Sequence, residues 1–128
     1  MGVLYAFDYL QKAIVHDINT LERYDDEVAE GHILTVIIFK NKSEMEASVL
    51  ADILKKASRK SDMVFRQENV FVLLMPATDK KGAQHIFSQM HEVCRNLDDL
   101  TILSYPEDAF GDEDFYKKIV AEVMAKNA

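Results

Sequence analysis

The segment Arg59–Asp79, RKSDMVFRQENVFVLLMPATD, decides the fold of this chain. Two runs rich in β-branched, aromatic and apolar residues, 63–66 and 70–75, stand on either side of a short polar turn. This pattern predicts a β-hairpin. The second run is apolar throughout, which is typical of a strand buried on both faces. Beyond it, Thr78 or Asp79 is expected to cap a helix.

Upstream of the hairpin, the sequence predicts a helix, a strand and a second helix. The first helix spans about 5–28, and residues 33–39, ILTVIIF, form a nearly continuous apolar run typical of a central strand. Ser43 and Glu46 have the spacing of a capping box, which marks the start of the second helix. Apolar residues at helical spacing are Phe7, Leu10, Ile14, Ile18 and Leu21 in the first helix, and Met45, Val49, Leu50, Ile53, Leu54 and Ala57 in the second.

Downstream of the hairpin, the sequence predicts a helix, a strand over 100–105 and a closing helix capped by Asp112. The apolar stripes of these helices are Ala83, Ile86, Phe87, Met90, Val93, Cys94 and Leu97, and then Phe115, Ile119, Val120, Val123 and Met124. The order contains β-α-β-β-α-β, the split or ferredoxin-like arrangement. It predicts an α/β (α+β) fold with a four-stranded, mainly antiparallel sheet flanked by helices. The strands joined by the first crossover are expected to be parallel, with a right-handed connection.

Length and composition indicate one soluble domain of 128 residues, with an N-terminal helix over 1–30 and a sheet–helix core over 32–128. The net charge of −7 argues against non-specific nucleic-acid binding. The longest apolar run, 70–77, is far shorter than the roughly 18 residues of a membrane span. A single cysteine, Cys94, excludes an internal disulfide. We therefore expect a cytoplasmic protein without membrane insertion.

The order of these elements and their local sequences resemble the GGDEF, or diguanylate cyclase, family over almost the whole chain. The stretch RKSDMVFRQENVFVLLMPATDKKGA resembles the family's hairpin region, commonly R-x-x-D-x-x-x-R-x-G-G-D-E-F followed by an apolar strand, Pro and Thr-Asp. INTLERYDDEVAEGHILTVIIFK resembles its first helix and strand, and LSYPEDAFGDEDFYKKIVAEVMAK its last strand, Tyr-Pro turn and closing helix. The resemblance implies a nucleotide cyclase-like fold in a bacterial signalling protein, whose active relatives join two GTP into cyclic di-GMP.

Two departures from the family predict the loss of that activity. The strand over 33–39 has no carboxylate, where the family carries a magnesium-binding aspartate. The signature turn is Gln67-Glu68-Asn69-Val70-Phe71, which lacks both glycines and the acid pair and is one residue shorter from Arg66. Magnesium needs hard oxygen ligands, and phosphoryl transfer depends on metal charge and positioning. We expect a degenerate, non-enzymatic domain with no catalytic residues, metal or cofactor.

One feature of the family is retained in its spacing. Arg59 and Asp62 match the Arg-x-x-Asp of the family's inhibitory site, and Arg66 follows four residues later. The resemblance therefore implies a cyclic di-GMP site at Arg59, Asp62 and Arg66, since an arginine can bind a phosphate or a guanine edge through two hydrogen bonds. In the alternative interpretation, Asp62 only caps the turn before the strand.

Three functions remain open on the sequence. The first is a regulatory or protein-interaction domain that pairs with itself or with another signalling protein through its N-terminal helix. The second is a cyclic di-GMP receptor, and the third is an enzyme with residual GTP-dependent cyclase activity. A titration with cyclic di-GMP and an incubation with GTP separate these possibilities.

Overall fold

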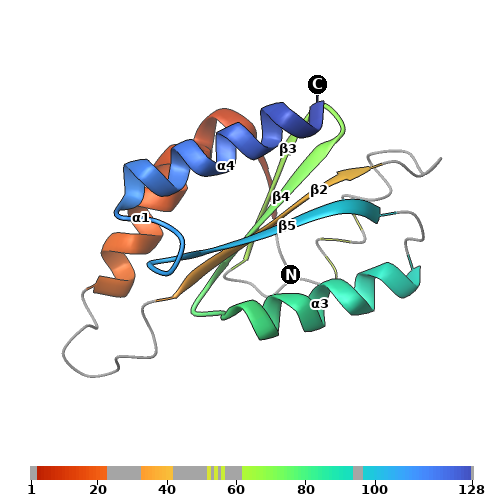
Figure 1. The fold of residues 1–128 in the computed structure, drawn as a ribbon, viewed down its shortest axis with the longest axis horizontal. Helices are drawn as coiled ribbons and strands as arrows, with labels where there is room; N and C mark the ends of the chain where they lie inside the picture. Colours follow the sequence, from red (N-terminus) through yellow and green to blue (C-terminus); the bar gives the residue numbers. More distant parts are fainter. Residues whose placement is uncertain are drawn as a thin grey trace.

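The protein is described here by a computed structural model, which covers residues 3–22, 33–41, 62–93 and 97–127, together with residues 52, 54 and 56. A five-stranded sheet forms its centre, in the order β1-β3-β4-β2-β5. Helices α1 and α4 cover one face of this sheet, and α3 covers the other (Figure 1). The elements are β1 (Val3–Ala6), the 3-10 turn η1 (Phe7–Tyr9), α1 (Leu10–Glu22), β2 (Leu34–Asn41), β3 (Met63–Gln67), β4 (Val70–Pro76), α3 (Lys80–Val93), β5 (Leu97–Tyr105) and α4 (Asp112–Asn127).

The predicted hairpin and its neighbours are confirmed. β3 and β4 pair as antiparallel strands, and β2 pairs antiparallel with both β4 and β5. β2 and β3 therefore run in the same direction with β4 between them, as the split arrangement requires. The expectation of a mainly antiparallel α+β sheet with flanking helices is thus correct.

The beginning of the chain differs from the prediction. Residues 3–6 form β1, which pairs in parallel with β3 from Val3 opposite Met63 to Ala6 opposite Arg66. The sheet has five strands instead of four, and the first helix begins at Leu10 instead of near residue 5. The sequence VLYA contains β-branched and aromatic residues that suit a strand. Because residues 3–6 pair with β3, they form a strand, although the helical spacing that includes Phe7 predicted a helix from about residue 5.

Two hydrophobic cores lie on the two faces of the sheet. The first core lies under α1 and α4, and it consists of Leu10, Ala13, Ile14, Ile18, Leu34, Val36, Ile38, Phe65, Val70, Val72, Leu74, Ala109, Phe115, Ile119 and Val123. The second core lies under α3, and it consists of Ile37, Phe39, Leu54, Val64, Phe71, Leu73, Met75 and Ala83. Successive residues of β4 contribute alternately to the two cores, which explains its continuous apolar sequence.

The predicted helix starts are close to those observed. Asp79 caps α3, because its Oδ1 accepts a hydrogen bond of 2.8 Å from the Gly82 amide. In α4 the Gly111 carbonyl accepts the first helical bond from Phe115, so Asp112 is the first helical residue and not the cap. The capping box at Ser43 and Glu46 lies outside the described residues.

Four other expectations need correction or lie wholly or partly outside the described chain. Leu97 begins β5 and does not extend α3, so this strand is three residues longer than predicted. Met124 is 67% exposed, whereas it was expected to face inward from α4. In the predicted second helix only residues 52, 54 and 56 are described, and Leu54 is buried as expected. Cys94 lies outside the described residues.

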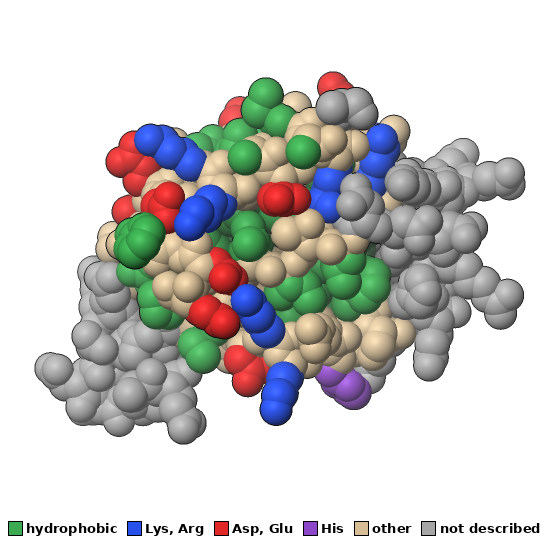
Figure 2. All heavy atoms as spheres, viewed as in Figure 1, with side chains coloured by type: hydrophobic (Ala, Val, Ile, Leu, Met, Phe, Trp, Pro, Cys, Tyr) green, Lys and Arg blue, Asp and Glu red, His purple; other side chains and the backbone are tan. Residues whose placement is uncertain are grey.

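The surface carries charges of both signs. Figure 2 shows acidic and basic side chains next to one another over α4 and the sheet end beside it, with hydrophobic atoms between them. Within the described residues, no helix is long and apolar enough to cross a membrane.

Candidate functional site

The turn between β3 and β4 is a tight two-residue turn, at which Gln67 pairs with Val70. Glu68 has a left-handed backbone with a φ of 55°, a conformation that glycine adopts without strain. The Arg66 side chain folds back on the turn, and its Nε donates a hydrogen bond of 2.8 Å to the Glu68 carbonyl. The side-chain amide of Asn127 donates a hydrogen bond of 3.2 Å to the Gln67 carbonyl. Side chains of the protein itself therefore hold this turn in place.

The end of β2 meets the hairpin in an aromatic cluster. Lys40 lies opposite Val70, and Phe39 lies opposite Phe71. The rings of Phe39 and Phe71 stack with centroids 5.7 Å apart and an interplanar angle of 14°. Phe87 of α3 packs against Phe39 with centroids 6.1 Å apart. Four of these five side chains are hydrocarbon and the fifth is an ammonium, so none of them is an oxygen ligand for a metal ion. On its other side, Lys40 lies opposite Asp98 of β5.

The rest of the described chain also offers no cluster of metal ligands. Across residues 3–22, 33–41, 62–93 and 97–127, no group of three or more His, Cys, Asp or Glu could hold a metal ion. Glu68 is the one acidic residue in the sequence of the hairpin, and it is exposed.

Of the three residues predicted to bind cyclic di-GMP, the structure describes Asp62 and Arg66. Arg59 lies outside the described residues. Asp62 directly precedes β3 and is 1% exposed, whereas Arg66 is exposed near the turn at the other end of that strand. Four residues of extended chain span about 13 Å. Asp62 and Arg66 therefore lie at opposite ends of β3.

A second carboxylate, Asp17 of α1, lies near Asp62. Burial raises the pKa of Asp17 to about 6, against the charge of His16, which lowers it, and with the charge of Asp62, which raises it further. The Asp17 Oδ2 atom is buried and has no hydrogen-bond partner among the described residues. Sequence reasoning missed this residue. Its position between Ile14 and Ile18, next to the apolar stripe of the helix, was the available signal.

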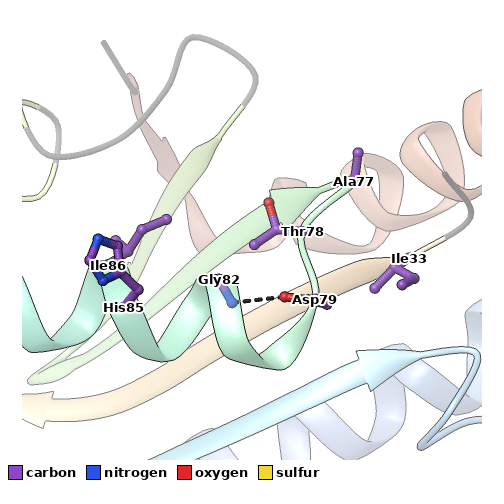
Figure 3. A pocket seen from close by; sticks show the side chains of 7 residues that line it. All are labelled: Ile33, Ala77, Thr78, Asp79, Gly82, His85 and Ile86. Atoms are coloured by element: carbon purple, nitrogen blue, oxygen red, sulfur yellow. Dashed lines mark hydrogen bonds between the residues drawn. The ribbon is translucent and has the colours of Figure 1, made fainter. Parts of the chain in front are cut away.

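A hollow lies at the opposite end of the sheet from the hairpin turn, where β4 leads into α3. It has a volume of about 740 Å³. Figure 3 shows its lining side chains, which come from the start of β2, the loop after β4 and the first turns of α3. They are Ile33, Ala77, Thr78, Asp79, Gly82, His85 and Ile86.

Local backbone geometry shapes this hollow. Ala77 has a φ of 55°, and its amide donates a hydrogen bond of 2.7 Å to the Ile33 carbonyl, which ties the loop after β4 to the start of β2. A Cβ atom on Gly82 would lie 3.1 Å from the Thr78 methyl group and 3.3 Å from the Asp79 carboxylate. Glycine therefore lets the first turn of α3 approach the capping residue closely.

Beneath the hollow, a buried hydroxyl network joins three elements. Thr35 of β2 donates a hydrogen bond through its Oγ1 to the Thr78 carbonyl. A second hydrogen bond of 2.7 Å joins Thr35 Oγ1 to Ser104 Oγ of β5. Thr35 and Ser104 are 0% and 2% exposed, so these bonds satisfy polar atoms that water does not reach.

A smaller hollow of about 280 Å³ adjoins the first and shares Ile33 and Asp79 with it. Lys80 lies on its wall and forms an ion pair of 2.9 Å with Asp108. The hydrogen bond to Asp108 raises the pKa of Lys80. Partial burial by itself raises the pKa of Asp108, but the Ser104 amide and the Lys80 ammonium bring it below its usual value. Both groups remain charged at neutral pH.

Together, the two hollows carry side chains of the kinds that are found in small-molecule binding sites. They combine the Asp79 carboxylate, the His85 imidazole and the Lys80 ammonium with apolar walls, which is the usual composition of small-molecule pockets. Sequence reasoning identified Thr78 and Asp79 only as cap residues. The hollow depends on Ile33, which lies more than forty positions earlier in the chain, so no local motif marks it.

Comparison with known proteins shows which solved structure this fold is similar to. No known family's sequence profile matches the chain, and no curated protein matches its sequence. Among solved structures, the crystal structure of a DGC protein from Thermotoga maritima is similar, with a TM-score of 0.67 and 21% sequence identity. The alignment covers 94% of this chain and 96% of that one. The chain therefore has the fold of that protein over nearly its whole length.

Proposed function

We propose that this protein is a GGDEF-like signalling domain that has lost cyclase activity and acts by regulation or protein contact. The shared fold with the DGC protein supports the first part of the proposal. The family resemblance of the hairpin region, quoted above, supports the same class.

The observation that carries the loss of activity is the pairing of Lys40 with Val70, beside the Phe39–Phe71 stack. In an active relative, this junction of strand and hairpin would supply metal-binding carboxylates. A lysine at this position places a positive charge where a magnesium ion would need oxygen ligands. Two buried phenylalanines occupy the adjoining space, and water-coordinated metal does not enter such an apolar cluster.

The structure also supports contact through α1. One side of this helix is buried in the first core through Leu10, Ile14 and Ile18. On its other side, an open surface hollow of about 460 Å³ is lined by Gln11, Lys12, Val15, His16 and Asn19. A partner could pack on this side without disturbing the domain.

The decisive test is an incubation of the purified protein with GTP and either magnesium or manganese, with product analysis by chromatography. We expect no cyclic di-GMP and no loss of GTP, whereas an active cyclase assayed in parallel gives both. The variant Glu68→Gln serves as a matched control, because it removes the acid of the hairpin. Cyclic product from the unaltered protein that disappears in Glu68→Gln would contradict the proposal and assign an enzyme.

Calorimetric titration with cyclic di-GMP tests the receptor alternative. Under our proposal, no heat of binding is expected at high micromolar ligand. Binding that is lost in Arg59→Ala would assign a receptor at Arg59 and Asp62. Binding that Arg59→Ala leaves unchanged would place a ligand site elsewhere in the protein.

A further inference from the structure

The loop between β5 and α4, residues 106–111, presents a phenylalanine to water. Phe110 is 99% exposed, whereas the preceding residue, Ala109, is 7% exposed and belongs to the first core. Burial of an aromatic ring against another apolar surface is favourable. Aromatic residues are enriched at the centres of protein interfaces, where a few of them carry most of the binding free energy.

Hydrogen bonds hold the backbone of the loop that carries Phe110, and one ammonium lies near its ring. The Phe110 amide donates a hydrogen bond of 3.0 Å to Asp114, and the Lys118 ammonium lies 5.7 Å from the centre of its ring. Lys118 also donates to the Asp108 carbonyl at 2.6 Å, and the Asp108 amide donates to the Ser104 carbonyl at 2.7 Å. A loop that is already ordered loses less conformational entropy on binding than a mobile one.

The surroundings of Phe110 are acidic. The segment 107–114 contains five carboxylates: Glu107, Asp108, Asp112, Glu113 and Asp114. Three lysines form ion pairs with them, Lys80, Lys117 and Lys118, so the group keeps a net charge of −2. The Glu113–Lys117 pair is more than 70% exposed on both sides, and solvent screens such pairs. Figure 2 shows this mixture of acidic, basic and hydrophobic side chains beside the start of α4.

We propose that Phe110 anchors a protein-docking surface whose occupant is a partner protein with an apolar pocket edged by Lys and Arg side chains. The proposal rests on the signalling role proposed above only for the expectation that a partner exists. The ring supplies buried apolar area, and the carboxylates around it supply charge complementarity, which favours association and orients the partner. Nucleic acid and anionic membranes do not fit, because their phosphates would face these carboxylates.

The first experiment identifies the partner. A photoreactive benzoylphenylalanine is placed at position 110 of the full chain in the cells that produce it, and crosslinked proteins are identified by mass spectrometry. The same residue at position 124 is the control, because Met124 is also exposed and belongs to α4. We expect a protein that crosslinks from position 110 and not from 124. The absence of any crosslink specific to position 110 would overturn the proposal.

The second experiment measures the dissociation constant with that purified partner. Phe110→Ala is expected to raise it at least ten-fold, whereas Met124→Ala changes it less than two-fold. The dissociation constant should also rise with salt, because the partner's basic groups face the carboxylates. Both residues are exposed, so circular dichroism and the melting temperature should match those of the unaltered protein. Equal effects of the two substitutions, or no effect of salt, would overturn the proposal.

Two further measurements distinguish other occupants. Concentration-dependent dimerisation in analytical ultracentrifugation that Phe110→Ala abolishes would assign a second copy of the chain instead. Sedimentation with anionic lipid vesicles that depends on Phe110 would assign a membrane. Either result would overturn the proposal of a basic protein partner. Neither result would affect the proposed loss of cyclase activity, since that claim depends on GTP turnover alone.

Discussion

Phe39 of β2 stacks on Phe71 of β4, with ring centroids 5.7 Å apart, at the junction where the hairpin turn begins. Both rings are fully buried in the second core. Their packing stabilises this end of the sheet. Stability should therefore depend strongly on these rings.

Phe71→Ala is expected to lower the free energy of unfolding by about 3–5 kcal/mol, because it removes the ring that stacks on Phe39 and leaves a cavity there. Phe71→Leu keeps most of the volume and should cost less than about 1.5 kcal/mol. Urea denaturation followed by circular dichroism measures both values. An alanine variant as stable as the leucine variant would show that this cluster is not tightly packed.

Glu68 has the left-handed backbone of a glycine, and this geometry has a measurable cost. Glu68→Gly should stabilise the protein by about 0.5–1 kcal/mol, because relief of the backbone strain exceeds the added flexibility of the unfolded chain. Asn69→Gly is the control, because Asn69 does not have a positive φ and glycine there only adds flexibility. The two melting temperatures should move in opposite directions. A decrease in both would contradict the backbone assignment at Glu68.

Asp17 should make stability depend on pH in an unusual direction. Its pKa in the folded protein is about 6, above the ordinary value of 3.8, so the folded state binds more protons between these values. The contribution of Asp17 to the stability of the folded protein should therefore fall as the pH rises from about 4 to 7. Asp17→Asn removes the buried charge and should raise the melting temperature at neutral pH and have little effect near pH 4.

Asp8→Asn is the matched control for this pH series, since Asp8 is exposed in η1. Its melting temperature should follow that of the unaltered protein at every pH. If Asp17→Asn proves no more stable than Asp8→Asn at neutral pH, the charge of Asp17 is not costly.

Thr35 tests the buried hydroxyl network beneath the larger hollow. Thr35→Val keeps the shape and removes hydrogen bonds to the Thr78 carbonyl and to Ser104, which should cost about 1–3 kcal/mol. Thr35→Ser keeps the hydroxyl and loses only a methyl group, at about 0.8 kcal/mol. Thermal unfolding gives the difference. A valine variant more stable than the serine variant would rule out a stabilising role for this network.

The central elements were predictable because their patterns are local. β4 is apolar at every position since both of its faces are covered, and Asp79 caps α3 through a contact three residues away. β1 was missed because its four residues become a strand only by pairing with β3, some sixty positions later. Met124 follows the helical spacing of α4 and is nevertheless exposed, because no element of the described chain covers it.

The candidate site was less accessible to sequence reasoning. The departures in the hairpin could be identified from the sequence, because they concern which residues stand in one short turn. The hollow beside His85 could not, because it combines Ile33 with the loop after β4, and only the folded sheet brings them together. Asp17 and Asp62 likewise become neighbours only when α1 packs on the sheet.

The position of β1 also bears on aggregation. By pairing with β3, residues 3–6 cover the backbone amides and carbonyls of a longer strand, and they leave a four-residue strand as one of the two borders of the sheet, the other being β5. Short border strands are poor templates for intermolecular β-pairing. Removal of these residues would expose the edge of β3 to other chains, so residues 3–6 shield this side of the sheet from intermolecular β-pairing as well as completing it.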